Sequence, residues 1–198
     1  MTGIALIIST IIGAPLGAVI GLAKFPGKGA VRALLYTGMG LPPVVVGLVV
    51  YLLLSRSGPL GPLGWLFTPS AMIVAQTCIA LPLTMGLTMT SVESVNPELK
   101  RQVVALGATR FQSAWTILRE ARIGVTAAIV AAVGGIISEV GAVMLVGGNI
   151  AGQTRVLTTA IVLNTRQGDF SLALALGLIL LTLTFVVNVA LMKLQGRT

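Results

Sequence analysis

Long uncharged stretches dominate this chain and limit the folds that are open to it. A helix of about 20 apolar residues is long enough to cross the hydrocarbon core of a bilayer. Inside lipid, every backbone N–H and C=O needs a partner within the protein, which favours helices for segments of this length. We therefore predict an all-α, polytopic transmembrane helical bundle, folded as a single domain over residues 1–198. The five predicted spans lie at about 3–23, 33–54, 70–92, 123–146 and 170–192.

Composition supports a membrane protein and argues against an enzyme. Only 9% of the residues are charged, whereas soluble domains carry about 25%. The sequence has no His, a single Cys (Cys78) and one acid, Glu139, inside a predicted span. Because His is the commonest general base and the commonest metal ligand, we expect no catalytic site, no metal and no cofactor.

Basic residues are unevenly shared between the two sides of the predicted bundle. With five spans, ten basic residues fall on one side and three on the other. Since Lys and Arg concentrate in cytoplasmic loops, we expect a multi-pass protein of the cytoplasmic membrane, surrounded by lipid. Its N-terminus is then outside, and its net charge of +8 needs no nucleic-acid partner. The ten are Lys24, Lys28, Arg32, Lys100, Arg101, Arg110, Arg119, Arg122, Lys193 and Arg197, and the three are Arg56, Arg155 and Arg166.

Prolines interrupt three of the five predicted spans. Pro15 lies in the first span, Pro42 and Pro43 stand together in the second, and Pro82 lies in the third. Proline removes a helical hydrogen bond and kinks the helix, so the double proline is expected to free the carbonyls of residues 38–39. Free carbonyls at membrane depth are tolerated only beside protein or a water-filled cavity. We interpret Pro42 and Pro43 as part of a translocation path or gate.

Small and hydroxylated residues recur at helical spacing in the first and third spans. The first span contains a ridge of glycines that lets a second helix approach closely. The third span contains a hydroxyl stripe, for which two interpretations stay open. It lines a translocation path, or its hydroxyls hold helices together by hydrogen bonds. The ridge is Gly13, Gly17 and Gly21, and the stripe is Thr77, Thr84, Thr88 and Ser91.

The fourth span combines a small-residue face with one acid. The face suits tight packing, including contact with a second copy of the chain. Glu139 is costly at this depth and is therefore a functional candidate. Because a glutamate repels an anion, we expect Glu139 to accept hydrogen bonds from nearby loop amides or to pair with an arginine. The face comprises Ala127, Ala131, Gly134, Ser138 and Gly141.

The segment after this span contains Asn149 and Arg155, which we include in the candidate path or gate. Residues 155–166 predict a helix capped by Thr154 and ended near Gly168. This helix is too short to cross the membrane. It is either a re-entrant helix that acts as an outer gate or an amphipathic helix at the membrane surface.

Residues 93–122 are a polar stretch that holds eight of the eighteen charged residues. Asn96 predicts a helix N-cap, and Gly107 predicts the end of that helix. Thr109 and Gln112 then predict a capping box that starts a second helix. Two rigid helices joined at a glycine suit a groove on another protein better than DNA, because the stretch is anchored between two spans. The second helix carries an apolar stripe of Phe111, Trp115 and Leu118.

This polar stretch resembles the cytoplasmic coupling loop of ABC-importer permeases. The resemblance rests on Ala105, Leu106 and Gly107, followed nine residues later by Ile117. The family's usual opening Glu-Ala-Ala is replaced here by residues 102–104, which read QVV, and its closing Leu-Pro by RE. Three further segments are similar to the molybdate/tungstate branch, nearest its tungstate type. They read KFPGK, GLPPVVVGLVVYLLLSRSGPLGPLG and SEVGAVMLVGGNIAGQTRVLTTAI.

The resemblance implies an importer for tungstate or molybdate, of which this chain is the membrane-spanning subunit. It implies two copies of the chain, two ABC ATPase subunits and an extracytoplasmic oxyanion-binding protein. ATP hydrolysis is then expected in the partner, and members of the branch generally have one further helix upstream. The residues expected to contact the ATPase are Ala105, Leu106, Gly107, Ala108, Arg110, Phe111, Trp115 and Ile117.

Other functions stay open. A secondary transporter or channel would use ion-coupling acids or an inverted repeat, and the sequence has one intramembrane acid and no clear repeat. Within the ABC class, sulfate or another small anion is an alternative substrate.

Overall fold

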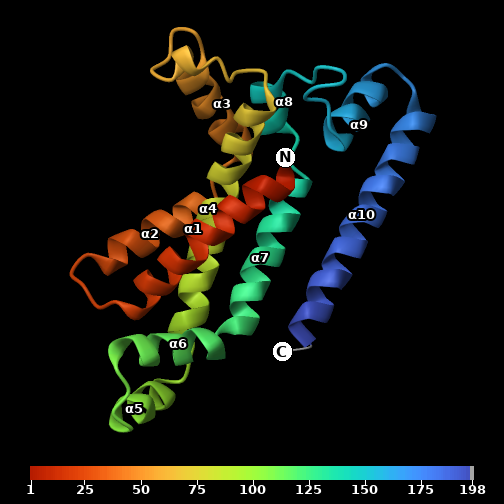
Figure 1. Ribbon diagram of the computed structural model, residues 1–198. Helices are drawn as coiled ribbons and strands as arrows, with labels where there is room; N and C mark the ends of the chain where they lie inside the picture. Colours follow the sequence, from red (N-terminus) through yellow and green to blue (C-terminus); the bar gives the residue numbers. More distant parts are fainter. Residues whose placement is uncertain (197–198) are drawn as a thin grey trace.

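The computed structural model describes residues 1–196, and these residues form helices joined by turns and loops (Figure 1). Arg197, one of the ten basic residues counted above, lies outside the described residues. In chain order the elements are α1 (Thr2–Leu22), α2 (Lys28–Met39), α3 (Pro43–Leu54), the 3₁₀ turn η1 (Gly61–Leu63), α4 (Pro69–Glu93), α5 (Pro97–Ala105), α6 (Arg110–Glu120), α7 (Arg122–Ile137), α8 (Gly141–Gly147), α9 (Leu157–Arg166) and α10 (Phe170–Gly196).

Helix α4 is the centre of the fold, and α1 packs along it through the predicted glycine ridge. A Cβ on Gly13 would collide with the Thr84 hydroxyl, and one on Gly17 would collide with the Met85 carbonyl. The prediction that this ridge permits close helix approach is therefore confirmed. Because glycine lacks a Cβ, the two backbones come close enough for extensive van der Waals contact.

The second predicted span is broken rather than kinked. α2 ends at Met39, α3 begins at Pro43, and the two helices meet at 96°. Because two adjacent prolines remove two backbone N–H donors, the helix is interrupted, and residues 40–42 are not helical. The Gly38 carbonyl, expected to be free, accepts a hydrogen bond from the Leu41 amide at 3.4 Å. Helix α2 also begins several residues before the predicted start.

The fourth predicted span, 123–146, is likewise two helices. α7 ends at Ile137 and α8 begins at Gly141, so Glu139 lies in the break and not within a helix. The small-residue face is exposed at Ala127, Ala131 and Ser138 within this single chain. A Cβ on Gly134 would meet open space.

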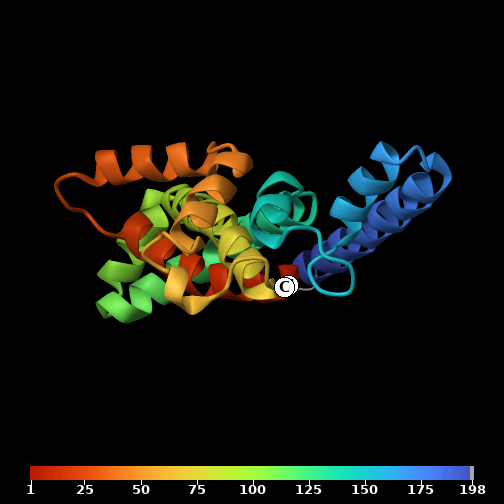
Figure 2. The same ribbon diagram turned by 90° about the horizontal axis from the view of Figure 1, so that it is seen from above.

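Among residues 1–196, three helices are long and apolar enough to cross a membrane by themselves: α1, α4 and the first 22 residues of α10. The number of candidate spans rises to five if each bent pair, α2 with α3 and α6 with α7, counts as one. Helix α10 is mostly exposed and stands with α9 to one side of the bundle (Figure 2).

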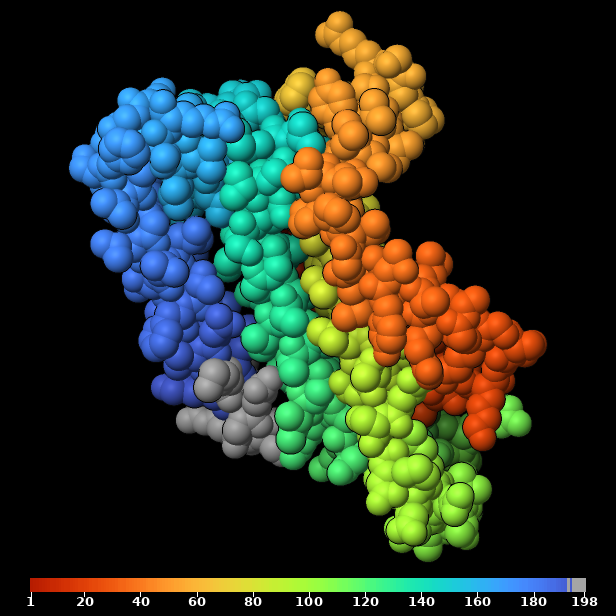
Figure 3. Space-filling view, turned by 180° about the vertical axis from the view of Figure 1, so that it is seen from behind, coloured from red at the N-terminus to blue at the C-terminus, as the bar shows by residue number. Residues whose placement is uncertain are grey.

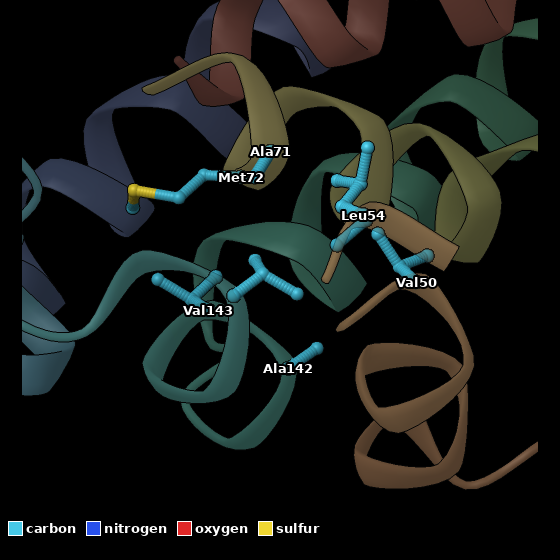
Figure 4. Packing of buried hydrophobic residues seen from close by; sticks show 8 residues of the cluster. Val50, Leu54, Ala71, Met72, Ala142 and Val143 are labelled. Carbon is cyan, nitrogen blue, oxygen red and sulfur yellow. The ribbon is translucent and has the colours of Figure 1, made fainter. Parts of the chain in front are cut away.

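A cluster of buried apolar residues closes the end of the molecule that carries the α3–α4 loop. It joins α3, α4 and α8 through Val50, Met72 and Val143, which are labelled in Figure 4. Small residues make this contact close: a Cβ on Gly47 would meet Ala142. The short helix α8 is therefore fixed against α3 and α4.

Helix α9 begins later than predicted. It starts at Leu157, where the Thr159 hydroxyl accepts a hydrogen bond from the Val156 amide at 3.0 Å. The prediction of Thr154 as the cap is wrong, because its hydroxyl donates to the Gly147 carbonyl at 2.6 Å and accepts from the Ile150 amide at 2.9 Å. Thr154 closes the preceding loop instead. The predicted end near Gly168 is confirmed.

Candidate functional site

Helices α5 and α6 form a rigid corner that projects beyond the ends of the long helices (Figure 3). The Asn96 side chain accepts a hydrogen bond from the Glu98 amide at 2.8 Å, which caps α5 as predicted. The Thr109 amide donates to Gln112 Oε1 at 2.8 Å, and the Gln112 amide donates back to the Thr109 hydroxyl at 3.3 Å. This is the predicted capping box.

Gly107 forms the bend between the two helices. Its φ of +79° lies in the left-handed region that glycine adopts without steric cost. The Gly107 amide donates to the Val104 carbonyl at 3.0 Å, and the Ala108 amide donates to the Val103 carbonyl at 3.3 Å. These bonds satisfy carbonyls at the end of α5 and fix the angle of the corner.

Three large apolar side chains of this corner, Leu106, Phe111 and Trp115, are largely exposed, although Trp115 also borders a pocket beside Pro15 of α1. Leu106 is 87% exposed, Phe111 80% and Trp115 62%. We call these three residues the apolar corner. A group of exposed apolar side chains on a rigid support is typical of a protein-binding surface.

The other residues of the predicted ATPase-contact set divide between surface and interior. Ala105 and Arg110 are exposed, and Ala108 is half-buried. Ile117 is only 4% exposed and packs in a cluster with Ala18 of α1 and Val92 of α4. Ile117 therefore anchors the corner to the long helices and does not face outward.

An ion-pair cluster, which the sequence analysis did not find, ties the same ends together. The Lys28 ammonium lies 3.0 Å from Glu93 Oε1, and Arg32 Nη2 lies 2.8 Å from both carboxylate oxygens. Lys28 also donates to the Gly21 and Ala23 carbonyls at 2.8 and 2.9 Å. The cluster joins the end of α1, the start of α2 and the end of α4. Glu93, an acid at the end of the third predicted span, was the available signal in the sequence. The uneven distribution of basic residues between the two sides of the bundle already explained Lys28 and Arg32 without an acidic partner.

We expect Glu93→Gln to lower the thermal stability of the purified protein modestly. The ion pairs are partly exposed, so their loss is worth about 1 kcal/mol or less, or about 2–4 °C in Tm for a chain of this size. Glu98→Gln is the control, because Glu98 is exposed and forms no ion pair within residues 1–196. Equal melting temperatures for both variants would show that the cluster does not stabilise the fold.

The proline break lies beside a cavity. Pro42 and Pro43 line a space of about 270 Å³ together with Gly38 of α2, Leu83 of α4 and Gly135 of α7. The break therefore meets a cavity at the point where three helices converge.

Glu139 accepts a hydrogen bond from the Ala142 amide at 2.7 Å, in the break between α7 and α8. This amide belongs to the first turn of α8 and not to a loop, so the role of Glu139 in organising loop amides stays a prediction. The alternative of an arginine partner is not observed within the described residues. Glu139 and Arg155 both line a cavity of about 620 Å³. The Arg155 guanidinium, however, donates to the Asn149 carbonyl at 3.4 Å.

Gln76 is a buried polar residue that the sequence analysis missed. It lies on α4 and lines the cavity of Glu139, 4% exposed. Its amide nitrogen donates at 3.3 Å to both the Thr2 hydroxyl and the Ile136 carbonyl, while its amide oxygen has no hydrogen-bond partner within the described residues. A polar side chain amid an apolar span was the signal that could have found it.

Thr84 and Thr88, both predicted for the path, are fully buried. The Thr84 hydroxyl donates to the Ser9 carbonyl of α1 at 3.0 Å, so it takes part in the α1–α4 contact. Asn149 has φ +51°, next to Gly148 at +71°, and forms a sharp turn after α8. Its side-chain oxygen is buried without a hydrogen-bond partner within the described residues.

Comparison with known proteins gives this geometry a context. Residues 13–198 match the family described as binding-protein-dependent transport system inner membrane component. The chain is 45% identical to a probable anion ABC transporter permease protein of Haloferax volcanii, over 98% of this chain and 86% of the relative.

Two further relatives are tungstate uptake system permease proteins named TupB. The one from Peptoclostridium acidaminophilum is 43% identical over 95% of this chain and 82% of its own length. The one from Campylobacter jejuni is 36% identical over 87% and 72%. With its long apolar helices and its projecting corner, the chain belongs to the family of inner-membrane components of binding-protein-dependent, ABC-type transport systems.

Proposed function

We propose that this chain is the membrane-spanning subunit of an ATP-driven importer that carries tungstate, or molybdate, across the cytoplasmic membrane. The observation that carries the proposal is the apolar corner of Leu106, Phe111 and Trp115. It is exposed at its tip and anchored at its base to α1 and α4 through Ile117. The names of the relatives support the substrate class, since two are tungstate permeases and one is an anion permease.

The proposed complex contains two copies of the chain, each a single permease domain over residues 1–198, and two ABC ATPase subunits. An extracytoplasmic binding protein delivers the oxyanion, and ATP is hydrolysed by the ATPase subunits alone. The N-terminus lies outside, and residues 93–122 lie in the cytoplasm. The exposed small-residue face of α7 supports contact with the second copy, because small residues let helices pack closely in lipid.

The proposed mechanism is mechanical. Closure of the ATPase pair pulls the apolar corner, and the corner moves α4, because α6 packs on Val92 and the Lys100 ammonium bonds to the Val92 carbonyl at 3.1 Å. Helix α4 contacts α2 and α3 on one side and α7 and α8 on the other. Its movement therefore reaches Pro42 and Pro43 in the first break and Glu139 in the second. We infer that these breaks switch between two discrete arrangements, as a gate requires.

Residues of the proposed path offer hydroxyl and amide donors, and the one cation of Arg155, to a passing dianion. Thr84, Thr88, Asn149 and Arg155 stay candidates for the path in one of its states. The hydrogen bond from the Ala142 amide stabilises the Glu139 carboxylate and weakens its repulsion of an anion. A site with few fixed cations releases an anion readily, which transport requires.

Uptake in cells tests the proposal. Cells that lack this chain are expected to lose high-affinity uptake of tungstate, and the intact gene restores it. Excess molybdate competes if both anions are carried, and excess sulfate does not. Unchanged tungstate and molybdate uptake in the deletion strain would contradict the proposed substrate. Uptake by the purified chain without an ATPase subunit would point instead to a secondary transporter.

A further inference from the structure

A basic pocket lies where the α1–α2 loop meets α5 and α6, and neither the apolar corner nor the proposed path accounts for it. Its volume is about 890 Å³. Four basic residues line it, and within the described part of the chain no acid does. The four are Lys24, Lys28, Lys100 and Arg110. So many cations in one pocket, without a neutralising acid in its wall, favour an anionic ligand.

Three of these cations, Lys24, Lys100 and Arg110, form no ion pair with an acid within residues 1–196 and have donors to spare. The Lys28 ammonium is fully engaged with Glu93 and two carbonyls of the α1 end. Lys100 uses one of its three donors on the Val92 carbonyl. Lys24 is exposed, and neither Lys24 nor Lys100 forms an ion pair with an acid within residues 1–196. Lys24 and Lys100 therefore each have donors left for an anion in this pocket.

The rest of the wall is largely apolar. Val19 and Leu22 come from the last turns of α1, and Val104 and Ile117 come from α5 and α6. Val19 is 60% exposed, although α1 is long and apolar enough to cross a membrane. A pocket with cations beside the apolar end of a span suits a ligand with an anionic group and an adjacent apolar part. That combination describes a membrane phospholipid better than a free anion.

We propose that this pocket binds the phosphate group of an anionic phospholipid, held by Lys24 and Lys100, with the glycerol and upper acyl chains against Val19 and Leu22. The bound lipid then bridges the end of α1 and the first helix of the corner. This inference requires only that the chain sits in a membrane, and it holds whichever solute is transported.

Lipid retention on the purified complex tests this inference. The complex is exchanged into detergent with equal amounts of phosphatidylglycerol and phosphatidylcholine of identical acyl chains, and bound lipid is counted by native mass spectrometry. We expect the wild type to retain phosphatidylglycerol preferentially. Lys24→Gln with Lys100→Gln should lower that preference at least about tenfold, since each basic residue near a lipid surface contributes about fivefold.

Matched variants separate charge from folding and from position. Lys24→Arg with Lys100→Arg keeps both charges and should retain the lipid. Arg56→Gln with Arg166→Gln removes two exposed charges elsewhere and should leave retention unchanged. Equal retention of both lipids by the wild type, or equal retention by the wild type and the Gln pair, would overturn the proposal.

A second arm distinguishes a lipid phosphate from a free one. Millimolar inorganic phosphate should not displace phosphatidylglycerol, because it lacks the apolar part that Val19 and Leu22 contact. Displacement by inorganic phosphate at that concentration would show that the pocket takes a free oxyanion, and the lipid assignment would be wrong. Lys100 also donates to the Val92 carbonyl in the coupling proposal, so Lys24→Gln alone is the variant that separates the two proposals. It leaves Lys100, Leu106, Phe111 and Trp115 unchanged and should by itself lower the preference for phosphatidylglycerol about fivefold.

Discussion

Gly107→Val will uncouple transport from ATP hydrolysis while leaving the chain in the membrane. Valine has to adopt a φ near +79° at this position, which costs about 1–2 kcal/mol for a residue with a Cβ. A Cβ at this position would meet no atom within 4 Å, so neighbouring residues do not oppose a change in the backbone there. We expect the strain to be relieved by a change in the angle between α5 and α6. Uptake is expected to fall by about 5- to 30-fold, the factor that such a free energy produces in an equilibrium.

Gly64→Val is the matched control for this substitution. Gly64 also has a positive φ, +63°, and open space around a Cβ, but it lies in the loop between α3 and α4. Both variants should accumulate to similar levels in membranes, and only Gly107→Val should lose transport and transport-stimulated ATPase activity. Retention of both activities by Gly107→Val would mean that the corner does not transmit force.

Gly17→Leu will prevent the chain from folding in the membrane. A Cβ at this position would collide with the Met85 carbonyl of α4, so no side-chain rotation removes the clash. Overpacking inside a protein typically costs about 1–3 kcal/mol, and here a backbone has to move. We expect the purified yield to fall severely and the remaining protein to aggregate on size-exclusion chromatography.

Gly3→Leu tests whether bulk itself is harmful in α1. Gly3 belongs to the same helix, but a Cβ there meets nothing within 4 Å. This variant should behave as the wild type, and Gly17→Ala should give an intermediate yield. If Gly17→Leu and Gly3→Leu accumulate equally well, the close α1–α4 contact is not needed for folding.

The features that local chemistry determines could be predicted from the sequence. Asn96, Thr109 and Gln112 form caps with partners two or three residues away. Gly107 forms the expected bend for the same reason, since a positive φ depends on the residue itself. The small-residue ridge around Gly17 was predictable too, because the first span places glycines on one face at every fourth position.

The features that depend on distant contacts could not be predicted. Glu93 pairs with Arg32, a residue 61 positions earlier in the sequence, and no local pattern indicates such a partner. Pro42 and Pro43 predicted a disturbance, but the angle of 96° is set by how α2 and α3 pack on α4. The small-residue face around Ala131 is exposed within the chain, so contacts inside the chain do not determine what packs against it.

Labelling of a cysteine at the tip of the corner tests the central claim most directly. With Cys78 replaced by alanine, Leu106→Cys places a thiol at a position whose native side chain is 87% exposed. Trp65→Cys, in the loop between α3 and α4, is the reporter for the side that the proposed topology places outside.

A membrane-impermeant maleimide is applied to right-side-out and to inverted vesicles, with and without the ATPase subunit. We predict that Leu106→Cys reacts only in inverted vesicles and is protected when the ATPase is bound, whereas Trp65→Cys reacts only in right-side-out vesicles. Labelling of Leu106→Cys from outside, or labelling from inside that the ATPase leaves unchanged, would contradict a cytoplasmic corner that an ATPase grips.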